Sequence, residues 1–168
     1  SIVYTSSGAV YGKQLQKNKK INDFQIIDIK SCFSTLKKKY ALLKIKNEKI
    51  FQEIADSNIK VCVARCFSFV GKYLPLDSNY VVGNFIKSIL YQKPIEVKSK
   101  ISVIRTYMHA DNLAECLIKL MFNNSTNFET YNIGSDNIVD IHLLAKKLGK
   151  KYHIKNIIPK NISNTMYD

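Results

Sequence analysis

A tyrosine and a lysine four residues apart are well placed for acid/base chemistry. Tyr40 and Lys44 lie in a stretch with helical spacing, where residues four apart share one face. An isolated phenol has a pKa of about 10, and lowering it by about 3 units costs roughly 4 kcal/mol. An ammonium group about 4 Å away supplies about 4 kcal/mol at an effective dielectric constant near 20, but only about 1 kcal/mol in water. Such a pair can therefore move a proton only where solvent is excluded.

A serine-rich turn near the start of the sequence could supply a third group. Residues 2–5 are apolar or β-branched, which is typical of a buried parallel strand, and Ser6 and Ser7 follow them. A hydroxyl at that strand end could bond the same substrate oxygen from which Tyr40 takes a proton. The structural alternative makes Tyr40 a half-buried aromatic beside a solvated lysine. The Tyr-x-x-x-Lys spacing by itself does not decide between the two.

The apolar pattern predicts alternating strands and helices around these residues. A helix is expected over 35–55, and the apolar run 60–71 is typical of a parallel strand covered on both faces. A strand, a helix and a strand in this order predict a right-handed βαβ unit. Ligands of such sheets bind at the carboxyl ends of the strands, which is where Ser7 would lie. Residues 13–30 indicate a long surface connection.

The second half of the chain alternates again. Asp111 and Asp140 are good N-caps for two of three expected helices, and Gly149 is placed to end the last one. The elements expected here are helices at 81–90, 111–121 and 141–148 and strands at 94–97, 101–110 and 131–134.

Composition indicates a soluble globular chain with a basic excess. The 168 residues are 46% hydrophobic and 23% charged, and the net charge of +13 comes from 26 basic and 13 acidic residues. Such a charge invites nucleic-acid binding, yet arginine, the better reader of bases, occurs only at Arg65 and Arg105. Lysine-rich solvated faces are the simpler explanation, and a basic binding domain is kept as the alternative. No apolar run is long enough to span a membrane.

The cysteines and the start of the sequence indicate in which cellular compartment the protein would fold. The four cysteines are scattered without a Cys-x-x-Cys pair, which argues against zinc and for free thiols in a reducing compartment. No targeting segment is visible, so we expect a cytoplasmic protein.

Ser7, Tyr40 and Lys44 resemble the catalytic groups of the extended short-chain dehydrogenase/reductase family, the NAD-dependent nucleotide-sugar epimerases and dehydratases. Three further blocks resemble that family, and they follow in its order over nearly the whole chain. They are the runs that begin with Arg65-Cys-Phe-Ser, with Arg105-Thr-Tyr-Met-His-Ala-Asp and with Tyr131-Asn-Ile-Gly-Ser. Each block has a plainer explanation, since Arg65 suits a structural salt bridge and Gly134 a turn.

The resemblance implies an α/β fold, the C-terminal part of a doubly wound, Rossmann-like parallel sheet plus a smaller substrate-binding domain. Residues 1–72 would belong to the first and residues 73–168 mainly to the second. Ser7 would be the catalytic hydroxyl, Tyr40 the acid/base and Lys44 its activating cation. The NAD contacts would be Tyr40, Lys44 and Phe67. The contacts to a nucleotide-diphosphate sugar would be Ser6, Ser68 and Arg105.

The sequence also departs from the family pattern. Its glycines lie at 8, 12, 71, 83, 134 and 149, so the Gly-rich dinucleotide turn is absent, and NAD and NADP cannot be told apart. Ser68 stands where the family usually has asparagine, and the loop before Arg105 lacks Gly-x-Gly. The chain therefore looks like the C-terminal half to two-thirds of an enzyme, inactive by itself. Surfaces that the remainder would cover favour a homo-oligomer.

The residues after Ser7 bear on the reaction. Family dehydratases carry an Asp-Glu pair there, whereas Gly8 and Ala9 can neither give nor take a proton. A nucleotide-sugar epimerase is therefore favoured, and a dehydratase, a reductase or a decarboxylase of the same family remains the alternative.

Overall fold

The computed structural model describes residues 1–12, 35–76, 78, 80–123, 125–159 and 165–167, so the connection expected over 13–30 lies outside the described residues. The helices are α1 (Thr35–Glu53), α2 (Val81–Leu90), α3 (Ala110–Phe122), α4 (Ile141–Tyr152) and a short 3-10 helix, η1 (Gly8–Tyr11). The strands are β1 (Ile2–Ser7), β2 (Val61–Cys66), β3 (Phe69–Val70), β4 (Ile95–Glu96), β5 (Ser102–Thr106), β6 (Met108–His109), β7 (Phe128–Ile133), β8 (Ile138–Asp140), β9 (Asn156–Ile157) and β10 (Thr165–Tyr167).

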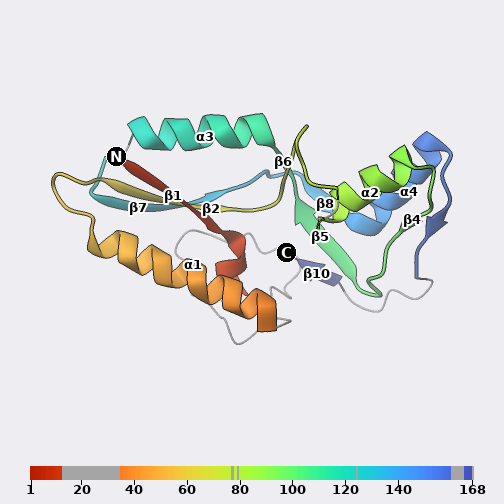
Figure 1. Cartoon of the computed structure of the whole chain (residues 1–168), viewed down its shortest axis with the longest axis horizontal. Helices are drawn as coiled ribbons and strands as arrows, with labels where there is room; N and C mark the ends of the chain where they lie inside the picture. The colour runs from red at the N-terminus through yellow and green to blue at the C-terminus, as the bar shows by residue number, and fades with distance from the viewer. Residues whose placement is uncertain (13–34, 77, 79, 124, 160–164, 168) are drawn as a thin grey trace.

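A three-stranded parallel sheet forms the first part of the molecule. Its strand order is β1-β2-β7, and α1 and α3 cover its opposite faces (Figure 1). Residues 61–64 of the central strand are wholly buried, as expected of a strand covered on both sides. The predicted βαβ unit, the helix over 35–55 and the α/β fold with parallel strands are confirmed. In this register Ser7 is level with Cys66, and Cys66 with Ile133, so the three strands end together.

The run 60–71 is not one strand, which corrects the sequence prediction. β2 ends at Cys66, and the Phe67 N–H donates to the Ile133 carbonyl at 2.9 Å. The chain then forms β3, which pairs with β6 in a separate two-stranded sheet. Hydrophobicity continues through this break because Phe67 packs over the sheet end, so the apolar pattern did not show it.

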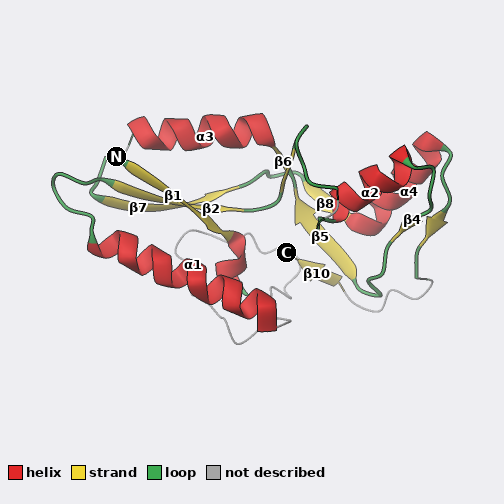
Figure 2. Cartoon of the chain, in the orientation of Figure 1, coloured by secondary structure: helices red, strands yellow, loops and turns green. Residues whose placement is uncertain are grey.

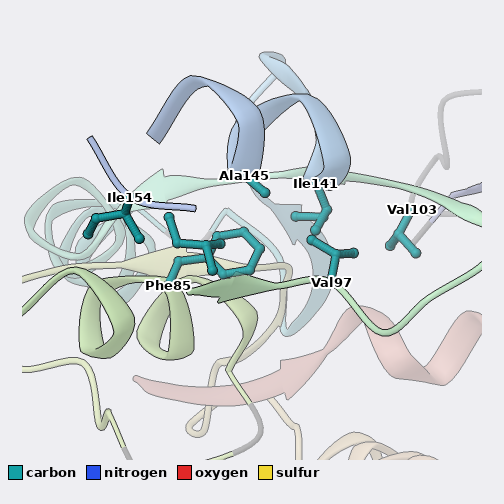
Figure 3. Close-up of a cluster of buried hydrophobic side chains, with 7 residues drawn as sticks. Phe85, Val97, Val103, Ile141, Ala145 and Ile154 are labelled. Carbon is teal, nitrogen blue, oxygen red and sulfur yellow. The ribbon is translucent and has the colours of Figure 1, made fainter. Parts of the chain in front are cut away.

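The second part packs helices against short strands around its own apolar core (Figures 2 and 3). β5 pairs with β8 in antiparallel and with β10 in parallel orientation, and β4 pairs with β9. The core side chains come from α2, α4 and the segments beside them, and they are Phe85, Ile95, Val97, Val103, Ile141, Ala145 and Ile154. No helix among the described residues is long and apolar enough to cross a membrane.

The chain passes between the two parts more than once. After the second part begins with α2, the chain returns through α3 and β7 to the parallel sheet (Figure 1). The predicted division into 1–72 and 73–168 is not tested by this arrangement and stays a prediction.

Two helix ends differ from the sequence prediction. The N-cap of α3 is His109, whose ring accepts from the Asp111 N–H at 3.3 Å, so Asp111 lies in the first turn instead. A carboxylate there still faces the positive end of the helix dipole. The last helix does not end at Gly149 but continues to Tyr152, with His153 in the left-handed region at φ 55°. Gly149 is needed for close packing, because a Cβ there would overlap the Asn156 amide.

Asp140 caps α4 as predicted. Its Oδ1 accepts from the backbone N–H groups of His142 at 2.7 Å and Leu143 at 3.0 Å, and its Oδ2 from the Ser102 hydroxyl at 2.6 Å. Burial disfavours the charged carboxylate, but these hydrogen bonds outweigh it and lower the pKa of Asp140 below its ordinary value.

We expect Asp140→Ala to lower the free energy of unfolding by about 1 kcal/mol, the usual value of an N-cap. Because the folded-state pKa is lowered, this contribution is present above the unfolded-state value of about 4 and is lost as the pH falls through the folded-state pKa. Urea unfolding of both proteins as a function of pH measures it. Asp111→Ala, at an exposed first-turn carboxylate, is the control and should cost less. If the difference in unfolding free energy between wild type and Asp140→Ala grew on acidification, the role of Asp140 as the N-cap would be contradicted.

Candidate active site

The carboxyl ends of β1, β2 and β7 hold three loops close together. Ser7 caps η1, and its Oγ accepts from the Ala9 N–H at 3.2 Å. The Phe67 ring fits between the loops that follow β1 and β7. A Cβ at Gly8 would lie 2.8 Å from its ring atoms, and one at Gly134 3.3 Å from its Cβ. The absence of a side chain at both glycines therefore lets Phe67 pack at the sheet end.

Tyr40 and Lys44 lie on one face of α1, beside β1. The Lys44 Nζ lies 5.8 Å from the centre of the Tyr40 ring and 5.1 Å from that of Tyr4. It donates to the Thr5 carbonyl at 2.7 Å, two residues before Ser7. Lys44 is half-buried, while Tyr40 is 48% exposed and open to a bound molecule. The helix packs on both β1 and η1. The Lys44 ammonium group therefore links the face of α1 that carries Tyr40 to the end of β1.

Ser6 differs from Ser7 because it is buried. Its hydroxyl donates to Glu48 Oε1 at 2.5 Å. That hydrogen is therefore engaged within the protein, and only the oxygen lone pairs of Ser6 could serve a substrate. Its predicted role as a substrate contact stays a prediction.

A buried polar network lies behind these residues. Arg65 holds Glu48 through two bonds, Nε to Oε1 at 3.1 Å and Nη2 to Oε2 at 2.8 Å. Its Nη1 donates to the Tyr11 hydroxyl at 2.8 Å, which donates in turn to Asn132 Oδ1 at 2.8 Å. Burial opposes the charge of Arg65, but the bonds to Glu48 and Tyr11 raise the pKa of the guanidinium on balance. Arg65 thus forms a structural salt bridge, the plainer explanation given for it above, whereas sequence reasoning missed Glu48, Tyr11 and Asn132.

One signal in the sequence could have found Glu48. It follows Lys44 by four residues, as Lys44 follows Tyr40, so the three share one helical face. Nothing in the sequence alone indicates that Tyr11 and Asn132, 121 positions apart, share a hydrogen bond.

Ser68 lies where the sheet meets the second part, and Arg105 lies on β5 of the second part. The Ser68 carbonyl accepts from the Met108 N–H at 3.1 Å and so joins the loop after β2 to β6. Arg105 is half-buried on β5, opposite Val139 of β8. Figure 1 shows β6 between the parallel sheet and the α2–α4 pair. Both residues stay predictions as substrate contacts.

The fold and this edge of the sheet define a Rossmann-like α/β protein, and solved structures share it. UDP-N-acetylglucosamine 4-epimerase from Methanobrevibacter ruminantium M1 matches with a TM-score of 0.76 and 19% identity, over 99% of this chain and 53% of that one. dTDP-glucose 4,6-dehydratase from Bacillus anthracis, in complex with NAD, matches with a TM-score of 0.73 and 17% identity, over 99% of this chain and 49% of that one.

The family follows from the sequence itself. The profile of the NAD dependent epimerase/dehydratase family matches residues 1–134, so the chain belongs to that family. UDP-glucuronic acid decarboxylase 3 of Arabidopsis thaliana is 25% identical over 151 residues, which are 88% of this chain and 42% of the relative. The chain thus spans about half the length of the proteins it matches.

Proposed function

We propose that this chain forms part of an NAD-dependent nucleotide-sugar epimerase and carries its acid/base groups. The observation that supports this is Lys44, whose ammonium group lies beside the Tyr40 ring and is bonded to the strand end that carries Ser7. Tyr40 takes the proton of a sugar hydroxyl, and Lys44 stabilises the resulting phenolate by its charge. The Ser7 hydroxyl bonds the same sugar oxygen and holds it in place.

The donor set fits the reactive end of a nicotinamide dinucleotide. Tyr40 is half-exposed and Lys44 half-buried at the carboxyl edge of a parallel sheet, where ligands of such folds bind. Tyr40, Lys44 and Phe67 would hold this end of NAD, which when bound accepts a hydride from the sugar and returns it. Arg105 would bond the diphosphate of the nucleotide sugar, with Ser6 and Ser68 as further substrate contacts.

A decarboxylase is the second candidate, favoured by the curated relative named above. Oxidation of the C4 hydroxyl of a nucleotide-linked uronic acid gives a β-keto acid. Its carboxylate leaves as carbon dioxide without an acid or base from the protein, and the enolate that remains takes a proton at C5 from water. Gly8 and Ala9 provide no such group, so they permit either reaction and disfavour the dehydratase. Product analysis with UDP-glucose and with UDP-glucuronic acid separates the two candidates.

In the full-length protein we expect Tyr40→Phe to abolish turnover and leave cofactor binding nearly intact, because only the proton-transferring hydroxyl is removed. A coupled epimerase assay and fluorescence titration with NAD measure the two effects. Tyr73→Phe is the matched control, an exposed tyrosine with Lys72 5.5 Å from its ring centre, and should change neither. Tyr40→Phe with full turnover would contradict the assignment.

The isolated chain provides a second comparison. Its sequence has no Gly-rich dinucleotide turn, and its Tyr40 is open to water, where an ammonium group contributes only about 1 kcal/mol. We therefore expect residues 1–168 alone neither to bind NAD tightly nor to turn over a nucleotide sugar. Measurable NAD-dependent turnover by this chain alone would contradict that part of the proposal.

We also propose that the protein associates with a second copy through α1. Leu36, Leu43 and Ile50 recur every seven residues on this helix and are 81%, 61% and 45% exposed. A row of exposed apolar side chains on one helical face is typical of a surface that binds another protein. Among the described strands β1 pairs only with β2, so its outer edge adds to the uncovered surface.

Light scattering over a range of concentrations tests this association. We expect a dimer or larger species for residues 1–168, and a shift toward monomer for Leu43→Glu, which places a charge in the apolar stripe. Leu90→Glu, at an exposed leucine of α2, is the control and should leave the mass unchanged. A clean monomer at high concentration would argue against the proposal.

A further inference from the structure

The buried network described above ties the Tyr40 helix to the strand that carries Ser7. Its members come from five elements of the chain, namely Ser6 of β1, Tyr11 of η1, Glu48 of α1, Arg65 of β2 and Asn132 of β7. Glu48 and Arg65 are 7% and 8% exposed, so neither can reach a bound sugar. Any role in the reaction must therefore act through other residues.

The position of Glu48 on α1 suggests what that role is. Tyr40, Lys44 and Glu48 follow one another at intervals of four residues, which in a helix advance about 6 Å and turn about 40° further each time. The Lys44 ammonium bonds the Thr5 carbonyl, and the Glu48 carboxylate bonds the Ser6 hydroxyl. Lys44 and Glu48, about one turn apart on α1, are therefore bonded to the two residues that directly precede Ser7.

The hydrogen bonds of Lys44 and of Glu48 differ in strength. The Lys44 bond is exposed to solvent and ends on a neutral carbonyl. Glu48 is held by two hydrogen bonds from the Arg65 fork as well as by Ser6, all within the protein interior. Two-point bonds between opposite charges fix orientation more tightly than a single bond from an ammonium group to a carbonyl. A rotation or a slide of α1 along β1 would have to break them.

We propose that Glu48 and Arg65 are positioning residues, which set the height and rotation of α1 against β1 so that the Tyr40 phenol faces the Ser7 hydroxyl. This proposal rests on the proposed function, because it takes Tyr40 and Ser7 to be the reacting pair.

The test replaces the whole ion pair in the full-length protein. Glu48→Met combined with Arg65→Met removes both charges at similar volume, an exchange that folded proteins often tolerate without losing stability. We expect kcat to fall by about 10²-fold, the effect of a misplacement of about 1 Å, while KM and NAD affinity change little. Glu115→Met with Lys119→Met removes an exposed ion pair of α3 and should leave kcat unchanged.

A second readout does not depend on activity. The fluorine NMR signal of fluorotyrosine at position 40 should shift or broaden in the double variant, with urea unfolding confirming that it is folded. If the double variant does not fold, Glu48→Gln replaces it, with an intermediate fall in kcat and a shifted signal expected. A folded variant with wild-type kcat and an unchanged fluorine signal would overturn the proposal. If the wild-type protein has no epimerase activity, the proposed function fails, and the fluorine signal alone decides the positioning role.

Discussion

The ion pair between Glu48 and Arg65 is the interaction on which the arrangement of the site depends. Two opposite charges buried in contact depend on each other, since removing one partner leaves an unpaired charge and costs about 3–5 kcal/mol. The pair joins the central strand β2 to α1, and Ser6 and Tyr11 extend it to β1 and η1. The position of the helix that carries Tyr40 is thus coupled to the integrity of the sheet.

The parallel sheet supplies the second constraint. Because β1, β2 and β7 end at the same level, the loops that follow them crowd together, and Gly8 and Gly134 make room for Phe67. The Phe67 ring therefore lies directly beside Gly8, the residue that follows Ser7. In the proposed function, this apolar end of the sheet adjoins the strand that carries Ser7, whose hydroxyl would bond the sugar.

Periodicity and motif spacing predicted the βαβ unit, α1, the Asp140 cap and the family. They failed where the outcome depends on contacts distant in sequence. The break after Cys66 arises because the Phe67 N–H pairs with Ile133. α4 runs past Gly149, and the glycine makes room there for the Asn156 side chain of β9. The polar network escaped prediction for the same reason, since Tyr11 meets Asn132 only once β1 and β7 lie in one sheet. The local sequence pattern thus predicts helices and strands well, whereas the contacts between them depend on how they pack in the folded chain.

The central claim is that Tyr40 and Ser7 act on one oxygen of a nucleotide sugar. A crystal structure of the full-length protein with NAD and a UDP-sugar tests this most directly. The account predicts that the Tyr40 phenol oxygen and the Ser7 hydroxyl oxygen both lie within hydrogen-bond distance, about 3 Å, of the same sugar hydroxyl. A complex with Tyr40 turned away from Ser7, and with other side chains at the reacting hydroxyl, would contradict it.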